Sequence, residues 1–232
     1  MQVKNVLVFA PHPDDEVLGC GGVIARHVAE GADVYICYVT SGFPPVYDNT
    51  IAVQNGWPHN LYPEIKASQK VLGVRDVFFL QFPVVALETV PRYELTGKIQ
   101  ELINQVQPDV VYIPHFGDMQ KDHAITSESV MVCVRPKGAH TVSQVYAYET
   151  LSETEWNIPH STNAFMPNVF VDIGKFMDKK IAAMKCYQSQ LSDFPNPRSL
   201  EAMASLAKLR ASTMNCSGGA AEAFMLIREY RA

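Results

Sequence analysis

The sequence lacks the features of membrane, secreted and nucleic-acid-binding proteins. No apolar run reaches the roughly 18 residues that a membrane-spanning helix needs, and the opening Met-Gln-Val-Lys does not resemble a secretion signal. The net charge is −5, with 19 Lys and Arg among 232 residues, whereas nucleic-acid-binding surfaces are basic. We therefore expect no membrane span and no nucleic-acid partner.

Cysteine is scarce and follows no ligand or disulfide pattern. The five cysteines are an odd number and include no Cys-x-x-Cys pair. A disulfide framework or a cysteine zinc site would need paired spacings. Cysteines in apolar surroundings are typical of a reducing compartment, so we expect a cytoplasmic protein.

Length and composition are those of one folded domain. The chain is 47% hydrophobic and 19% charged, and a chain of this length can bury a large core. We find no internal repeat, low-complexity tract or sharp change of composition, which predicts a single domain over residues 1–232. A homo-oligomer is compatible with the sequence.

A cluster of acidic residues and one histidine lies near the start of the chain. An apolar, strand-like run at residues 6–9 leads into the turn Pro-His-Pro-Asp-Asp-Glu at residues 11–16, and a glycine-rich helix start follows. Glycine-rich turns of this kind often bind phosphate, but three acidic residues would repel it. His12 and Asp15 are metal-ligand types at a three-residue spacing. The turn therefore predicts a cation site, although an acidic helix cap would use one of these carboxylates.

Strand and helix patterns alternate along the chain. We expect strands at 6–9, 34–39, 77–80, 109–113, 145–148 and 169–172, and helices at 17–29, 63–72, 92–106, 124–134, 175–188 and 199–211. Such alternation predicts right-handed crossovers between parallel strands. The expected fold is α/β, a Rossmann-like three-layer sandwich with a mostly parallel sheet.

A second polar cluster follows the strand expected at 109–113. Because carboxyl ends of parallel strands share one sheet edge, His123 from this cluster should meet His12 and Asp15. Two histidines and one carboxylate leave coordination positions open for water and substrate. This set predicts one divalent ion and hydrolysis of an amide. Ferrous-iron oxygen chemistry is the less favoured alternative.

Other acidic and amide side chains in the two clusters have candidate roles. Asp14 is adjacent to a ligand but free to move a proton, and we predict that it is the general base. Gln120 is a candidate donor to a developing oxyanion. We expect Asp118, Asp122 and His115 to orient ligands or shape turns rather than bind the ion directly.

The long segment at residues 40–60 is rich in proline, glycine and aromatic residues. Loops of this length inside compact domains are usually functional. Phe43, Tyr47 and Trp57 could present flat apolar faces to a sugar ring, which makes them candidate substrate contacts. Packing of the loop onto the domain is the alternative role for these rings.

Several motifs together resemble the PIG-L/LmbE-like family of zinc-dependent N-deacetylases, which act on N-acetylglucosamine-type sugars. The resemblance rests on the turn at 11–16, the Asp-x-x-x-Asp-His element at 118–123, and supporting elements at 187–190 and 221–224. It spans nearly the whole chain. Many members of the family have a histidine where this chain has Gln120, and an arginine near Leu61, where this chain has none.

The resemblance implies a zinc ion bound by His12, Asp15 and His123, with Asp14 as the base. It implies a hydrolase that removes the acetyl group from a small-molecule N-acetylated amino sugar. Two alternatives stay open: an amidase for a larger acyl group, and a metal- or sugar-binding module with impaired catalysis. Gln120, in place of the family's usual histidine, is compatible with a binding module, whereas the presence of Asp14 argues against that alternative.

Overall fold

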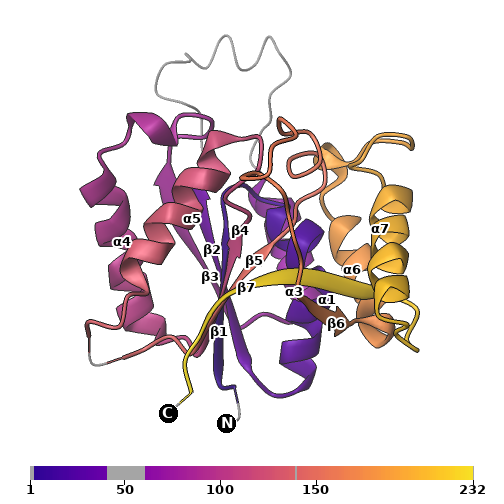
Figure 1. The fold of residues 1–232 in the computed structure, drawn as a ribbon, viewed down its shortest axis with the longest axis horizontal. Helices are drawn as coiled ribbons and strands as arrows, with labels where there is room; N and C mark the ends of the chain where they lie inside the picture. Colours follow the sequence, from indigo (N-terminus) through magenta and orange to yellow (C-terminus); the bar gives the residue numbers. More distant parts are fainter. Residues whose placement is uncertain (1–2, 41–60, 139, 232) are drawn as a thin grey trace.

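The computed structural model describes residues 3–40, 61–138 and 140–231. It is an α/β sandwich around one seven-stranded sheet with the order β3-β2-β1-β4-β5-β7-β6 (Figure 1). The strands are β1 (Asn5–Ala10), β2 (Asp33–Thr40), β3 (Asp76–Phe82), β4 (Val110–Pro114), β5 (Gln144–Tyr148), β6 (Val169–Asp172) and β7 (Ala221–Glu229). The α-helices are α1 (Asp15–Ala29), α3 (Tyr62–Leu72), α4 (Arg92–Val106), α5 (Lys121–Cys133), α6 (Met177–Met184) and α7 (Leu200–Thr213). Short 3-10 turns are η1 (Leu87–Thr89), η2 (Gly174–Phe176) and η3 (Gln188–Gln190).

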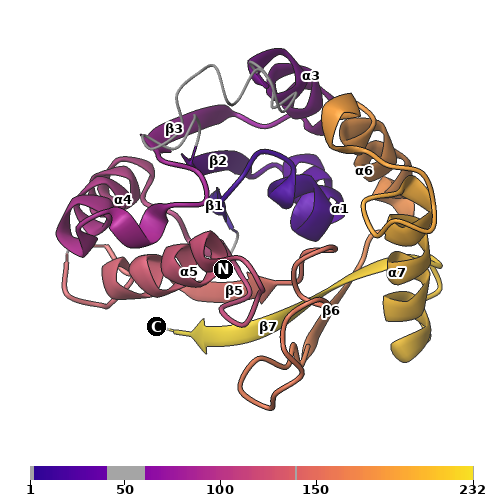
Figure 2. The ribbon, with the colours of Figure 1, turned by 90° about the horizontal axis from the view of Figure 1, so that it is seen from above.

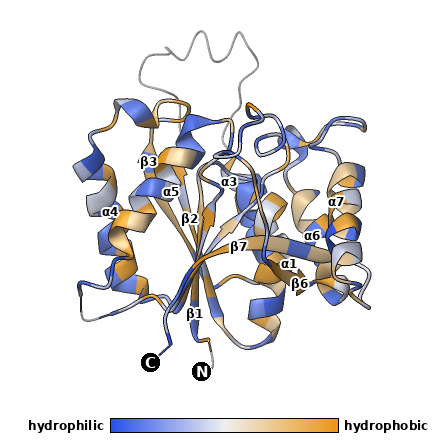
Figure 3. Cartoon of the chain, in the orientation of Figure 1, coloured by the Kyte–Doolittle hydropathy of each residue, from blue (hydrophilic) through white to orange (hydrophobic). Residues whose placement is uncertain are grey.

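Helices cover both faces of the sheet (Figure 2). Along β1, Val6 and Val8 belong to the core cluster that includes residues of α1, α3, α6 and α7, while Leu7 and Phe9 belong to the cluster that includes residues of α4 and α5. This alternation follows the two-residue period of a strand, and a strand covered on both faces needs apolar residues throughout. Figure 3 shows the resulting concentration of hydrophobic residues on the central strands. The expected three-layer, mostly parallel α/β fold is confirmed.

Six strands of the sheet run in the same direction, and β7, next to the edge strand β6, runs opposite to them. β3, β2, β1, β4 and β5 pair in parallel, whereas β7 pairs antiparallel with both β5 and β6. No helix in the described part of the chain is long and apolar enough to cross a membrane.

Glycines allow α1 to lie close to the sheet. A side chain at Gly19 would overlap the ring of Tyr148, and one at Gly22 would overlap Ile173. Glycine removes the Cβ at these two contacts, so the helix that follows the acidic turn can pack close to β5 and the segment after β6.

Most expected elements lie within a few residues of their observed bounds, with three differences. The helix expected at 124–134 begins at Lys121, which places His123 in its first turn. The helix expected at 175–188 is shorter: a 3-10 turn occupies residues 174–176, α6 ends at Met184, and Tyr187 beyond it is buried. The sequence pattern predicts no strand at Ala221–Glu229, where residues 221–224 stand out only as a family motif, but the structure has β7 there.

Candidate metal centre

The two polar segments that follow β1 and β4 lie at the place where the strand order of the sheet reverses. β1 pairs with β2 on one side and with β4 on the other, although β4 comes much later in the chain. In open α/β sheets, ligands bind beyond the carboxyl ends of the strands at such a switch point. The turn at 11–14 leaves β1 and the turn at 115–120 leaves β4, so both clusters reach the same place.

His12, Asp15 and His123 form a compact set of metal-ligand atoms. One ligand atom from each residue lies within 4.8 Å of the other two. Oδ2 of Asp15 is 3.3 Å from Nδ1 of His12 and 3.3 Å from Nε2 of His123. Within the described residues, Nε2 of His123 and Oδ1 of Asp15 are buried and have no hydrogen-bond partner. Two unpartnered atoms in a two-histidine, one-carboxylate set fit a divalent cation.

A carboxylate backs each of the two histidines. Nε2 of His12 lies 2.9 Å from Oδ2 of Asp122, and Nδ1 of His123 lies 2.8 Å from Oδ2 of Asp118. These contacts place a proton on the far nitrogen of each ring and leave the near nitrogen free for a cation.

The two backing carboxylates are themselves held in place. Asp122 accepts backbone N–H groups of Val85 at 2.7 Å and Leu87 at 3.2 Å. Asp118 accepts the hydroxyl of Thr154 at 2.6 Å. The ring orientations are therefore fixed by segments outside the two turns.

The charges around the set favour positive charge at this point. Burial lowers the pKa of His12, but the hydrogen bonds that its ring donates to Asp122 and Asp15 outweigh burial, and the pKa is raised to about 9. Burial likewise opposes protonation of His123, whose pKa is nevertheless raised by Asp15 and Asp118. A cation must displace protons from these rings, so its binding is linked to proton release.

Asp14 lies beside the set with one oxygen occupied and one unpartnered. Its backbone has a positive φ of 112°, and its side chain makes no helix-capping hydrogen bond. Oδ2 accepts Nη1–H of Arg198 at 2.6 Å, whereas Oδ1 is buried with no partner among the described residues. Burial raises the pKa of Asp14 to about 8, and Arg198 opposes that shift. A carboxylate with a pKa in this range can take up and return a proton near neutral pH.

Sequence reasoning missed Arg198. It lies just before α7 and also donates to the hydroxyl of Ser152 at 2.8 Å and to Oε1 of Gln190 at 3.3 Å. Gln190 belongs to the 187–190 element that supported the family resemblance, and this was the available signal that the C-terminal half reaches the site.

The other residues expected near the site have separate environments. Gln120 is the residue before α5; its N–H donates to Glu153 at 3.2 Å, and its Oε1 is buried without a partner in the described part of the chain. His115 is buried, but its Nε2–H donates to the carbonyl of Asn163 at 3.0 Å, and its ring packs against Phe165. His115 therefore anchors the segment between β5 and β6.

Three candidate substrate contacts cannot be placed. Phe43, Tyr47 and Trp57 lie outside the described residues, so their role stays a prediction.

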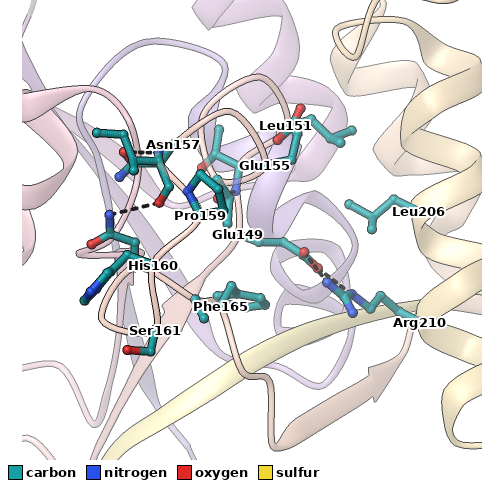
Figure 4. Close-up of a pocket in the computed structure, with 15 residues that line it drawn as sticks. Glu149, Leu151, Glu155, Asn157, Pro159, His160, Ser161, Phe165, Leu206 and Arg210 are labelled. Atoms are coloured by element: carbon teal, nitrogen blue, oxygen red, sulfur yellow. Dashed lines mark hydrogen bonds and ion pairs between the residues drawn. The ribbon is translucent and has the colours of Figure 1, made fainter.

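A cavity of about 560 Å³ lies between residues 149–165 and α7 (Figure 4). Arg210 points from α7 toward Glu149, and their ion pair closes one wall. Thr154 and Asn157 line the cavity and also donate to Asp118, through its side chain and its carbonyl respectively. The cavity thus adjoins the residue that backs His123.

The chain is similar to known proteins in sequence and in fold. The chain is 28% identical to the uncharacterized deacetylase YaiS of Escherichia coli K12 over 192 residues, covering 80% of this chain and 91% of that protein. It is 28% identical to the diacetylchitobiose deacetylase of Thermococcus kodakarensis over 204 residues, covering 82% of this chain and 72% of that protein. The crystal structure of the conserved protein TT1542 from Thermus thermophilus superimposes with a TM-score of 0.76 at 26% identity, covering 98% of this chain and 96% of that chain. The family model PIG-L, described as GlcNAc-PI de-N-acetylase, matches residues 7–134, and the chain therefore belongs to the PIG-L family of deacetylases.

Proposed function

We propose that this protein is a zinc-dependent deacetylase that removes the acetyl group from a small N-acetylated amino sugar of the N-acetylglucosamine type. One observation carries the proposal: His12, Asp15 and His123, a set that fits a cation, lie beside the buried carboxylate of Asp14, one oxygen of which has no hydrogen-bond partner among the described residues. A site that only bound a metal or a sugar would have no need of that second carboxylate. The similarity to a diacetylchitobiose deacetylase supports the sugar class.

The ligand set is His12, Asp15 and His123, with the two rings oriented by Asp122 and Asp118. Zinc suits two imidazoles and one carboxylate, and three protein ligands leave room for water and substrate. A divalent cation held there lowers the pKa of a water molecule and polarises the amide carbonyl.

Asp14 moves the proton. Its Oδ1 takes a proton from the attacking water and returns it to the nitrogen of the leaving amine as the C–N bond breaks. Arg198 holds Oδ2 at 2.6 Å, so the carboxylate cannot rotate freely and Oδ1 keeps one direction. The products are acetate and the free amino sugar.

Gln120 stabilises the developing charge on the acetyl oxygen. Its position before α5, with its backbone N–H held by Glu153 at 3.2 Å, fixes where its side chain begins. The side-chain amide can donate N–H to the oxyanion. Phe43, Tyr47 and Trp57 contact the sugar ring in this proposal, and the chain acts in the cytoplasm as a single domain with one ion.

The test is incubation of the zinc-reconstituted protein with a panel of N-acetylglucosamine conjugates, followed by mass spectrometry. We expect loss of one acetyl group from at least one conjugate, abolished by a chelator and restored by zinc. Matched conjugates with longer N-acyl chains serve as the control for acyl size. Faster cleavage of the longer chains would make the protein an amidase of a different substrate class, and binding of zinc without any cleavage across the panel would contradict the proposal.

A further inference from the structure

Glu16, the last residue of the acidic turn, is fully buried and accepts four hydrogen bonds. Its Oε2 accepts the backbone N–H of Asp14 at 3.0 Å. Its Oε1 accepts the hydroxyls of Tyr38 at 2.9 Å and Tyr187 at 2.7 Å, and the side-chain amide of Gln69 at 2.8 Å. Both carboxylate oxygens are therefore engaged.

The donors come from three separate parts of the fold. Tyr38 is on β2, Gln69 is on α3, and Tyr187 follows α6. They also contact one another: the two tyrosine hydroxyls are 3.1 Å apart, and Gln69 donates to Tyr38. All three are buried. The carboxylate of Glu16 is thus fixed by rigid elements, independently of the metal ligands.

Asp14 needs such support because its backbone is in an unfavourable region. At φ of 112°, a residue with a Cβ is outside the commonly occupied left-handed region, and such a conformation persists only where the surroundings impose it. The bond from its N–H to Glu16 acts directly on the peptide group that sets this angle. The angle in turn sets the direction of the Asp14 side chain.

We propose that Glu16 is a positioning residue for catalysis. Residues of β2, α3 and the segment after α6 hold its carboxylate in place, and the carboxylate in turn holds the backbone of Asp14. The inference rests on the proposed function of Asp14 as the base. Glu16 holds the Asp14 backbone so that Oδ1 is aimed at the reaction, while Asp15 remains directed at the ion. Its own carboxylate touches neither substrate nor metal.

A carboxylate is required because both of its oxygens must accept. Glutamine at position 16 would have one oxygen and one NH₂ group. In one orientation, the NH₂ group would face the N–H of Asp14. In the other orientation, it would face the groups of Tyr38, Gln69 and Tyr187 that donate to Glu16. Glu16→Gln therefore keeps the size of the side chain and disrupts one side of the arrangement.

The experiment compares Glu16→Gln, Tyr187→Phe and their combination in the zinc-loaded protein. We expect Glu16→Gln to lower kcat by about 10- to 100-fold, the range for lost supporting contacts, with KM and zinc content unchanged. Tyr187→Phe should lower kcat less, and should lower it no further in the Glu16→Gln background, because it acts through Glu16. Tyr112→Phe is the control: it removes a buried hydroxyl that contacts His27 near the other end of α1, and it should leave kcat unchanged.

The outcomes separate this inference from the proposed function. Asp14→Asn is measured alongside: normal turnover in that variant would remove Asp14 as the base and the proposed function with it. A large loss in Asp14→Asn together with a normal kcat in Glu16→Gln would overturn only the positioning role. Loss of zinc from Glu16→Gln would also overturn it, since the residue would then act on the ligands. If Glu16→Gln does not fold, a kcat loss in Tyr187→Phe larger than in Tyr112→Phe supports the inference, and equal kcat values contradict it.

Discussion

Arg198 and Asp14 are 184 residues apart in the sequence and form an ion pair of 2.6 Å at the candidate metal centre. The pair joins the segment before α7 to the acidic turn after β1. Asp14 is almost completely buried, whereas Arg198 is partly exposed. The arginine thus supplies the positive charge that stabilises the ionised form of a carboxylate which burial alone would keep protonated.

Replacing Arg198 should change the pH dependence of turnover. Burial raises the pKa of Asp14 to about 8 and Arg198 opposes this shift, so Arg198→Leu should raise that pKa further. The base must be ionised to accept a proton, so the acid limb of the kcat profile should move to higher pH. At a pH below the pKa, the ionised fraction falls about tenfold each time the pKa rises by one. A pH–rate series with added zinc measures this.

Arg198→Lys is the matched variant for that series. It keeps the charge, and its acid limb should lie between those of the wild type and Arg198→Leu. Identical acid limbs in all three proteins would show that the ion pair does not control the base.

Asp118 should influence the affinity for the metal without binding it. Asp118→Asn replaces the carboxylate that accepts from Nδ1 of His123 at 2.8 Å, so the ring loses its orienting partner. Changes of this kind typically weaken metal binding by about 10- to 100-fold. Competition with a chromophoric zinc chelator measures the affinity.

The control for this variant is Asp109→Asn. Asp109 accepts backbone N–H groups of Lys4 and Asn5 at the opposite end of β4, and its replacement should not change zinc affinity. Equal affinities for Asp118→Asn and Asp109→Asn would contradict the orienting role of Asp118.

Glu222 should be important for stability. It forms a buried ion pair of 2.6 Å with Lys180 and accepts the N–H groups of Gly22 and Val23 in α1. Glu222→Ala leaves the lysine charge buried and unpaired, and should cost about 3–5 kcal/mol of the free energy of unfolding. Chemical denaturation monitored by circular dichroism measures the loss.

Glu30→Ala is the contrast to Glu222→Ala. It removes an exposed ion pair with Arg26 of α1. Such pairs contribute at most about 1 kcal/mol to the free energy of unfolding. A similar small loss for both variants would mean that Lys180 finds another partner when Glu222 is absent.

The sequence predicted the parts of the site that depend on local spacing and on strand order. His12 and Asp15 are three residues apart in one turn, and their proximity needs no knowledge of the rest of the fold. The position of His123 next to them was predictable because strand–helix alternation predicts a parallel sheet, and the carboxyl ends of its strands lie at one edge. The structure places all three within ligand distance of one another.

The contacts that the sequence did not predict are non-local. Arg198 and Glu222 come from the C-terminal part of the chain. No periodicity specifies that Arg198 contacts Asp14 or that Glu222 accepts from the N–H groups of α1. In the sequence, nothing distinguishes Glu16 from the other acidic residues of the turn. Its hydrogen bonds from Tyr38 and Tyr187 show that its side chain points into the core. Such pairings depend on how α6 and α7 pack, and packing is not readable from local pattern.

The most direct test of the account is a paired measurement of zinc content and deacetylation in wild type and Asp14→Asn. Asparagine keeps the shape of the side chain but cannot accept the proton, so the account predicts full zinc content and a kcat lower by about 10²–10⁴-fold. The substrate is whichever N-acetylglucosamine conjugate the wild-type protein cleaves. Asp14→Asn protein that holds its zinc and releases acetate at the wild-type rate would contradict the central claim.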